Sequence, residues 1–357
     1  MAEIRYFLGG NTPAGFYSLY DELSDPHRIK RLYILKGGAG CGKSTLMKRV
    51  ALHGEAAGLQ VERILCSADP ESLDGVIFPS LGTAVVDGTA PHVMEANYAG
   101  AVERYVDLSI FYDRSALKPL TNAIIDATAE YKNRYKTIYR CLHAAGQLAQ
   151  DRAEPVVTDA IRQKLALRAK GIIRREIKPA KTESGILCRR FLSAITCKGP
   201  VALWDTVNVQ AERVYRLSDS YGLAHWLLSP ILTAALAAGQ NCVACYDPMD
   251  PEGLAHLILP GLSLAFVTDC PMFPRECKDY RHLRLDAMTE SNQSRSLRPR
   301  LRFSQKVSAA LVDEAVTGLI RAKEDHDRLE ALYNPHVDFD GVTQLADDLA
   351  EEIIANH

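Results

Sequence analysis

Several features that would assign the chain to a class at once are scarce or missing. The formal net charge is only −2 over 357 residues, so the overall charge does not favour nucleic acid or an acidic membrane surface as a partner. The apolar run WLLSPILTAALAAG (226–239) is too short to cross a bilayer and contains a proline. Residues 1–16 lack the basic start and apolar run of a signal peptide. We therefore expect a cytoplasmic protein with no membrane partner.

A disulfide framework is also not indicated. The nine cysteines are an odd number spread over a large chain, which is typical of reduced, mostly buried thiols. The one CxxC pair, Cys242 and Cys245, lies in the strand-like run QNCVACYD, where a spacing of three points the two sulfurs to opposite faces. With 47% hydrophobic and 24% charged residues, the composition predicts a well-packed globular protein long enough for two domains.

What the sequence does contain is a phosphate-binding motif of the Walker A type. The apolar, strand-like run RLYILK (31–36) leads into GGAGCGKS (37–44), which fits GxxxxGK[ST] at every required position. A helical pattern follows from residue 44 to residue 58. The predicted nucleotide-binding residues are Gly37, Gly38, Ala39, Gly40, Cys41, Gly42, Lys43, Ser44 and Thr45.

Each part of this motif has a chemical role. Glycines let successive backbone N–H groups turn toward an anion, and the positive end of the following helix points at the same place. Lys43 is expected to bridge the β- and γ-phosphates, and the Ser44 hydroxyl to ligate Mg²⁺. Cys41 lies near a helix N-terminus, which favours a thiolate, but we interpret it as a small filler residue.

A second magnesium ligand is expected at the end of a neighbouring strand. Residues 83–86 form a buried, strand-like run and Asp87 stands at its carboxyl end, where ligands collect in open α/β sheets. Asp69 and Asp74, in CSADPESLDG, are competing candidates, and their alternative role is turn formation. The two roles remain open for Asp69, whereas the turn is favoured for Asp74.

The residues after Asp87 bear on the reaction. Gly88 follows it instead of the glutamate that activates water in fast P-loop ATPases, which disfavours a motor or a transporter engine. His92 is a candidate base or γ-phosphate sensor, with a structural loop histidine as the alternative. An NKxD guanine-reading element is not evident, so ATP is favoured over GTP as the ligand.

The chain also carries an internal repeat. Residues 7–21 align with 191–205, Arg31 with Arg213, and 69–81 with 250–262, in the same order. In this register Lys43 aligns with His225 and Ser44 with Trp226, neither of which can replace its partner on a metal–nucleotide. We therefore expect only the first copy to bind nucleotide.

The repeat predicts an internally duplicated α/β fold, with P-loop-type parallel sheets flanked by helices. We expect a nucleotide-binding domain over 1–183 and a degenerate repeat over 184–357, each with a helical appendage. Residues at spacings of three and four, mostly apolar and with His326 among them, predict packed helical seams over 124–145 and 315–333. The basic runs 161–178 and 295–303 are interpreted as solvated surfaces, or as the source of an arginine finger from Arg295, Arg298 or Arg300.

The chain resembles a family of bacterial two-repeat P-loop proteins that are assigned as ATPases or nucleotide kinases. The resemblance implies a duplicated P-loop fold with nucleotide bound at 37–45, and it covers essentially the whole chain. Relatives often keep a usable glycine loop in the second half, and this chain departs from that pattern at 218–226. The motifs that carry the resemblance are GNTPAGFYSLYD, LKGGAGCGKST, DPESLDGV and VDGTAPH in the first half, and FLSAIT, DPEGL and HDRLEALY in the second.

The leading functional hypothesis is a slow, Mg²⁺-dependent ATPase. Lys43 and Ser44 would hold the phosphates and the metal, Asp87 would order the metal, and Asp69 or His92 would manage the nucleophile. One alternative is a kinase for a nucleotide or other small metabolite. Another is a regulatory or scaffold protein that ATP switches, with the degenerate half as a surface for a protein partner.

Overall fold

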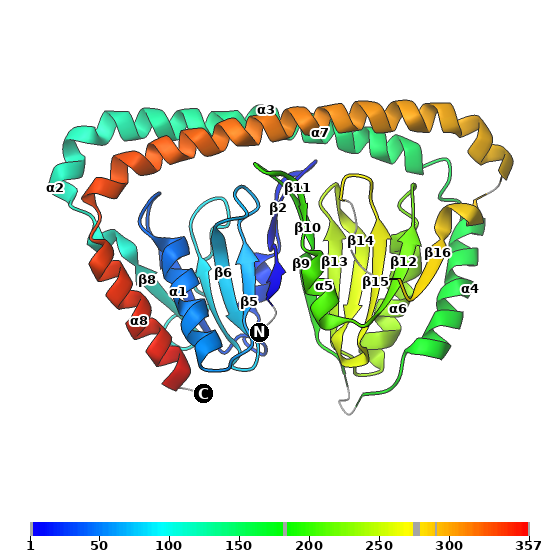
Figure 1. Cartoon of the computed structure of the whole chain (residues 1–357), viewed down its shortest axis with the longest axis horizontal. Coiled ribbons are helices and arrows are strands. Elements are labelled where there is room, and N and C mark those ends of the chain that lie inside the picture. The colour runs from blue at the N-terminus through cyan, green and yellow to red at the C-terminus, as the bar shows by residue number, and fades with distance from the viewer. Residues whose placement is uncertain (1–2, 181–183, 274–278, 290, 356–357) are drawn as a thin grey trace.

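The computed structural model describes residues 3–180, 184–273, 279–289 and 291–355, with only the backbone of 291–298. The chain folds into two similar α/β halves that stand side by side beneath a pair of long helices (Figure 1). Each half is built on a six-stranded sheet. This arrangement confirms the internal duplication predicted from the sequence.

The first sheet mixes parallel and antiparallel strands. β1 pairs in parallel with β5, and β4 pairs in parallel with β7 and β8, but β6 runs antiparallel to both of its neighbours, β5 and β7. The expectation of parallel sheets is therefore wrong for β6. In sheet order the strands are β1 (Ile4–Tyr6), β5 (Glu62–Leu65), β6 (Leu73–Phe78), β7 (Thr83–Asp87), β4 (Arg31–Lys36) and β8 (Glu103–Asp107).

The second sheet repeats this order. Its third strand, β14, again runs antiparallel to both neighbours. The equivalent strands are β9 (Leu187–Phe191), β13 (Cys242–Asp247), β14 (Asp250–Leu259), β15 (Leu264–Asp269), β12 (Arg213–Ser218) and β16 (Arg281–Arg284). Cys242 and Cys245 of β13 belong to different hydrophobic clusters, as expected for opposite faces of a strand.

The halves meet through equivalent elements. Two short hairpins, β2 (Gly9–Thr12) with β3 (Gly15–Ser18) and β10 (Ser193–Thr196) with β11 (Gly199–Ala202), lie between the sheets (Figure 1). Next to them Phe7 and Phe191 exchange backbone hydrogen bonds, N to O 3.0 Å in one direction and 2.9 Å in the other. Because these two phenylalanines are repeat equivalents, the contact is reciprocal.

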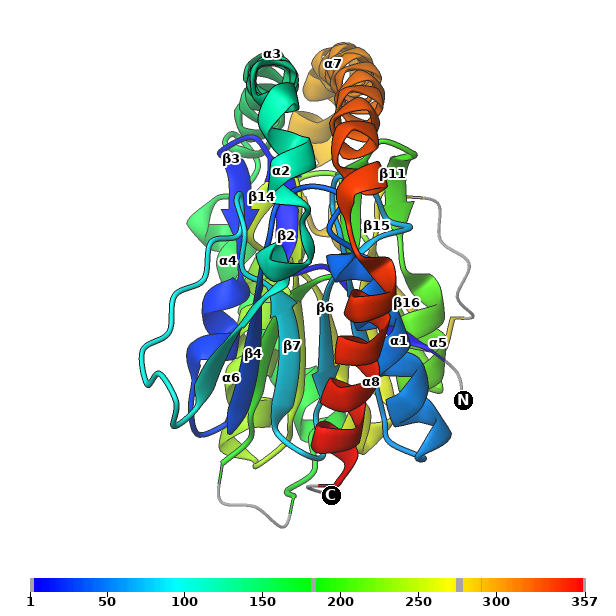
Figure 2. The ribbon, with the colours of Figure 1, turned by 90° about the vertical axis from the view of Figure 1, so that its left-hand side faces the viewer.

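The long helices form an antiparallel pair that spans both halves. They are α3 (Thr121–Ala153), preceded by the short α2 (Arg114–Leu117), and α7 (Ser291–Tyr333), as Figures 1 and 2 show. The predicted seams are confirmed as packing surfaces. Their buried members are Ile138, Leu142, Ala145, Ala315, Leu319, Ala322 and Leu329.

The helices that follow the long pair are exchanged between the halves. α4 (Asp159–Glu176) comes after α3 but packs on α6 (Ala224–Ala237) of the second half. α8 (Phe339–Ala355) comes after α7 but packs on α1 (Lys43–Ala56) of the first half. The predicted boundary at residue 183 borders residues 181–183, which lie outside the described part of the chain. The segment before this boundary and the segment after it each form one sheet. Each also supplies one helix that packs on the other half.

Apolar patterning explains both docking faces. The buried residues of α4, Ile161, Leu165, Ala169 and Ile172, recur at helical spacing, and so do Val342, Ala346, Leu349 and Ile353 of α8. α6 is apolar nearly all round because it lies between its sheet and α4. In the described part of the chain, no helix combines the length and the apolarity needed to cross a membrane.

Candidate functional site

The predicted glycine loop joins β4 to α1 as the motif requires. β4 ends at Lys36 and α1 begins at Lys43, so the loop lies at the carboxyl edge of the first sheet. Gly40 and Gly42 have φ angles of 68° and 84°, in the left-handed region that favours glycine. The sequence prediction of strand, loop and helix is confirmed at this place.

Lys43 lies folded back over the loop. Its Nζ donates to the carbonyl oxygens of Gly37 (3.0 Å) and Gly38 (2.8 Å). It is also 3.7 Å from Oδ2 of Asp87, at the end of β7. The ammonium group is thus held at the mouth of the loop by weak neutral acceptors and one carboxylate, which an anionic ligand can replace.

Cys41 fills the inside of the loop. Its side chain is buried, and its Sγ is 3.7 Å from Nζ of Lys43. A Cβ atom on Gly37 would lie 2.6 Å from that sulfur, so the cysteine also explains why residue 37 must be a glycine. This geometry supports the interpretation of Cys41 as a filler. Thr45 is exposed on the first turn of α1.

Ser44 and Asp87 present oxygen atoms beside Lys43. Ser44 Oγ accepts a hydrogen bond of 2.9 Å from the backbone N–H of Leu73, the first residue of β6. Asp87 Oδ1 accepts from the backbone N–H (2.9 Å) and the hydroxyl (2.6 Å) of Thr89, while Oδ2 faces Lys43. A hydroxyl and a carboxylate oxygen are ligands that suit Mg²⁺, so these two residues could hold it.

Asp74 and His92 form a buried pair that the sequence reasoning only half anticipated. Asp74 lies within β6, so the favoured turn role is wrong, and its Oδ2 is 3.3 Å from Nε2 of His92. Burial lowers the pKa of His92, but Asp74, with a smaller effect of Asp87, outweighs it and raises that pKa above its ordinary value. Since Asp74 directly follows Leu73, the pair stands next to Ser44.

Asp69 takes the turn role of the two left open for it, and its site role stays a prediction. Its carboxylate accepts from the backbone N–H of Glu71 (3.1 Å) and the hydroxyl of Ser72 (3.4 Å), which is turn chemistry. Its Oδ2 is also 3.5 Å from Nζ of Lys323, on α7. This ion pair connects the turn after β5 to a helix that belongs to the second repeat.

The loop is covered by residues from two distant parts of the chain, Tyr112 and Asn334. With its amide oriented to donate, Asn334 bonds the carbonyl oxygens of Gly40 (3.0 Å) and Glu330 (3.2 Å). The hydroxyl of Tyr112 donates to the carbonyl of Ala39 (3.2 Å). These contacts were not predicted, because no motif marks residues 330–334 as neighbours of a loop almost three hundred positions earlier.

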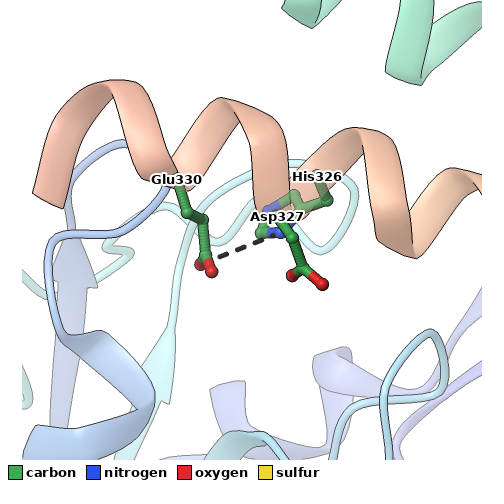
Figure 3. Close-up of side chains that lie close together, drawn as sticks. All are labelled: His326, Asp327 and Glu330. Atoms are coloured by element: carbon green, nitrogen blue, oxygen red, sulfur yellow. Dashed lines mark ion pairs between the residues drawn. The ribbon is translucent and has the colours of Figure 1, made fainter.

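His326, Asp327 and Glu330 form a further cluster on the side of α7 that faces the first sheet (Figure 3). Their ligand atoms lie within 4.8 Å of one another, and Nδ1 of His326 is 3.7 Å from Oε1 of Glu330. Asp327 is already paired with the ammonium group of Lys323, which opposes a cation there. His326, expected in the helix seam, instead lies at its edge with its ring centroid 5.2 Å from that of Tyr131.

In the second half, the loop is one residue shorter than expected. α6 begins at Ala224, and Nδ1 of His225 accepts from the backbone N–H of Leu254 (3.2 Å), as Ser44 accepts from Leu73. Lys43 therefore corresponds to Ala224 and Ser44 to His225, so the predicted pairing of Lys43 with His225 and of Ser44 with Trp226 is wrong by one residue. Trp226 packs beneath the guanidinium of Arg162, on α4, at 4.0 Å from the ring centroid.

A carboxylate occupies the helix N-terminus of the second loop. Asp219 directly follows β12, as Gly37 directly follows β4, and it accepts from the backbone N–H groups of Tyr221 (2.9 Å) and Ala224 (2.7 Å). An internal anion thus satisfies the donors that a phosphate would use. The second loop lacks the lysine of the first, and Asp219 stands where the first loop has Gly37.

The predicted arginine finger is not brought to the site. Arg300 is exposed and lies thirty residues before Glu330 on α7, about 45 Å away at a helical rise of about 1.5 Å per residue. The side chains of Arg295 and Arg298 lie outside the described part of the structure. The other basic run forms α4, which packs on the second half.

Comparison of the chain with protein-family models, with curated proteins and with solved structures gave no match. The family resemblance inferred from the motifs therefore remains a prediction.

Proposed function

We propose that this protein binds ATP with Mg²⁺ at the loop 37–45 and hydrolyses it slowly. The observation that carries the proposal is the convergence of Lys43, Ser44 and Asp87 at the N-terminus of α1, beside a glycine loop at the end of β4. Backbone N–H groups and a helix N-terminus suit a phosphate chain, and the lysine adds a mobile positive charge.

The chain's own groups then have distinct tasks. Lys43 would leave the carbonyl oxygens of Gly37 and Gly38 and bind the β- and γ-phosphates. Ser44 and Asp87 would hold Mg²⁺, which supplies charge neutralisation at the phosphates when it is bound. No covalent intermediate on the protein is required.

The Asp74–His92 pair is the group we assign to the nucleophile. Asp74 is one residue from the partner of Ser44, so a water beside the terminal phosphate would lie near its carboxylate. The raised pKa of His92 favours its protonated form, which suits a proton donor or a charge sensor better than a base. Asp69, held by Lys323, takes a supporting place at the edge of the site.

A kinase is the second candidate, favoured by the aromatic lining of α3. The rings of Tyr131, Tyr135 and Tyr139 follow one another at centroid distances of 5.5 and 5.7 Å. Burial raises the pKa of Tyr131, and Cys66 and Asp74 act in the same direction against a hydrogen bond with Tyr135, so Tyr131 lies on the side of the site that holds Cys66 and Asp74. Such a surface suits an acceptor with a planar or apolar part.

Isothermal titration with Mg·ATP tests the binding. We expect one nucleotide per chain for the parent and at least ~100-fold weaker binding for Lys43→Ala, since a charge-assisted contact to phosphate is lost. Asp219→Ala is the matched control, because it removes a charge at the equivalent loop of the second half and should bind ATP as the parent does. Unchanged binding by Lys43→Ala would refute the proposal.

Phosphate release separates hydrolysis from transfer. With Mg·ATP alone, an ATPase releases phosphate at a rate that Lys43→Ala and Asp87→Asn both lack. A protein that binds ATP normally but releases no phosphate without an added hydroxyl compound is a kinase, and the ATPase assignment is then wrong.

A further inference from the structure

We propose that Lys323 of α7 is a second cation of the nucleotide site and contacts the terminal phosphate of the bound triphosphate. The inference rests on the proposed ATP site. It assigns to the second repeat a direct part in the chemistry of the first.

The helix that carries Lys323 is fixed against the loop. A Cβ atom on Gly40 would lie 3.3 Å from both Cα and the carbonyl oxygen of Glu330, so α7 touches the loop backbone there. Asn334 bonds the Gly40 carbonyl one turn further on. Lys323 lies seven residues before Glu330, which is two turns or about 10 Å along the helix.

The ion pair of Lys323 with Asp69 places the lysine side chain at the same edge of the first sheet as the glycine loop. Its ion pair of 3.5 Å with Asp69 lies at the end of β5, while Glu330 marks the loop after β4. Between β5 and β4 in the sheet stand β6 and β7, which carry Asp74 and Asp87. The segment from Lys323 to Glu330 therefore crosses the strand ends where the metal and the nucleophile are expected.

The negative charges at this edge of the sheet favour a second cation beside the bound phosphates. Among the described side chains here, Asp69, Asp74 and Asp87 are acidic, and a triphosphate would add more negative charge. Lys43 is the cation supplied by the loop. The nearby α3–α7 seam contains two arginines, Arg134 and Arg328, but both are already paired with the buried Asp325.

The environment of Lys323 allows it to change partners. Its side chain is 32% exposed, and it is shared between Asp327 on its own helix and Asp69 across the site. Although burial lowers its pKa, Asp327 and Asp69 outweigh burial and keep the amine protonated. A flexible four-carbon stem can turn from one oxygen anion to another at little cost in energy.

In the second half a cation of the first repeat stands at a different place on its helix. Arg152 lies one residue before the end of α3, where burial lowers its pKa and Cys270 and Asp219 act in the opposite direction. Its neighbour there is the carboxylate that follows β12. In the first half the loop has no such carboxylate, and Lys323 approaches a place that a phosphate would take.

The test compares ATP with ADP, each with Mg²⁺, by isothermal titration on the full chain. We expect Lys323→Ala to weaken ATP binding about tenfold and ADP binding less than about threefold, because only ATP carries the phosphate that Lys323 contacts. Lys323→Arg, which keeps the charge, should restore most of the preference for ATP. Arg321→Ala, which removes an exposed cation two residues away, should match the parent.

Each outcome supports or refutes the role of Lys323 or the proposed ATP site. Unchanged ATP binding by Lys323→Ala, or equal losses for ATP and ADP, would overturn the inference, the latter because it indicates a structural role. If Lys43→Ala binds ATP like the parent, the proposed function itself fails. If Lys43→Ala loses ATP and Lys323→Ala does not, the nucleotide site stands and only the role of Lys323 falls.

Discussion

The two loops of this chain lie in the same fold but differ in the residue that follows the strand. In the first, Gly37 follows the strand, and residues 37–42 include no carboxylate that could accept from the backbone N–H groups at the start of α1. In the second, Asp219 follows the strand and its carboxylate accepts from those N–H groups. A single side chain at the start of the loop can thus convert an anion site into a self-capped turn without altering the surrounding sheet.

The comparison extends to the positions around the loops. Lys43, Ser44 and Asp87 correspond to Ala224, His225 and Thr268, so the three residues proposed to hold the phosphates and the metal are all replaced. The backbone contact survives, since His225 accepts from Leu254 where Ser44 accepts from Leu73. The second half keeps the hydrogen bond that supports the fold and lacks the groups that we propose for phosphate binding in the first.

The largest expected effect tests whether both halves depend equally on an exchanged helix. Leu349→Ala on α8 and Leu165→Ala on α4 each leave a cavity under a docked helix, and we expect each to lower the free energy of unfolding by about 2–5 kcal/mol. Urea denaturation measures this. Leu167→Ala is the control, because Leu167 is 67% exposed and should change stability little. A value for Leu349→Ala close to that of the control would show that α8 does not dock on α1.

A smaller effect, dependent on pH, is expected at Asp247. Burial raises the pKa of this carboxyl to about 6, whereas its counterpart in the first half is the thiol of Cys66. A raised acid pKa means that stability falls as pH rises from about 4 to 6 and stays level above. Asp247→Asn should therefore be more stable than the parent at pH 7, by about 3 kcal/mol, with the difference vanishing near pH 4. A constant difference across this range would contradict the assignment.

Removal of the internal anion should have a modest effect on stability. Asp219→Ala leaves the N–H groups at the start of α6 without their acceptor, and we expect a loss of about 1 kcal/mol in thermal or urea unfolding. Its ATP binding should equal that of the parent. A stability equal to the parent's would indicate that water replaces the carboxylate fully.

The smallest effect concerns a titrating pair that only the first half has. Asp74 corresponds to Ala255, and Asp74 raises the pKa of His92. A raised histidine pKa adds stability that is complete below the ordinary pKa and is lost as pH rises through the folded value. Between pH 6 and pH 8 the parent should lose slightly more stability than Asp74→Asn, by less than about 1 kcal/mol. Parallel pH profiles would contradict this.

Local features of the site were predictable from sequence, and their surroundings were not. The run 31–44 specifies a strand, a glycine loop and a helix through short-range rules, and the position of Asp87 at the carboxyl end of β7 follows from the buried run 83–86 before it. The ion pair of Asp74 with His92 depends on β6 running antiparallel, which the apolar pattern of LDGVIF does not reveal. The turn signal at Asp74 was overridden by pairing within the sheet.

The long-range contacts had no local signal. Asn334 contacts the first loop, and Lys323 the turn after β5, only because α7 crosses the whole molecule. Amphipathic spacing predicts a buried face without naming what covers it. The one-residue register error arose for a related reason. A shorter loop at 219–223 keeps both flanking patterns intact, so residue matching alone did not locate the deletion.

The reciprocal contact of Phe7 with Phe191 and the exchange of α4 and α8 have a consequence for origin. A lone half would lack the helix that covers its own α1 or α6, so a single repeat with this fold would need a second copy to supply that helix, as in a symmetric dimer with swapped arms. With both copies in one chain the two loops need not stay identical, since each half contributes its arm whatever its own loop contains.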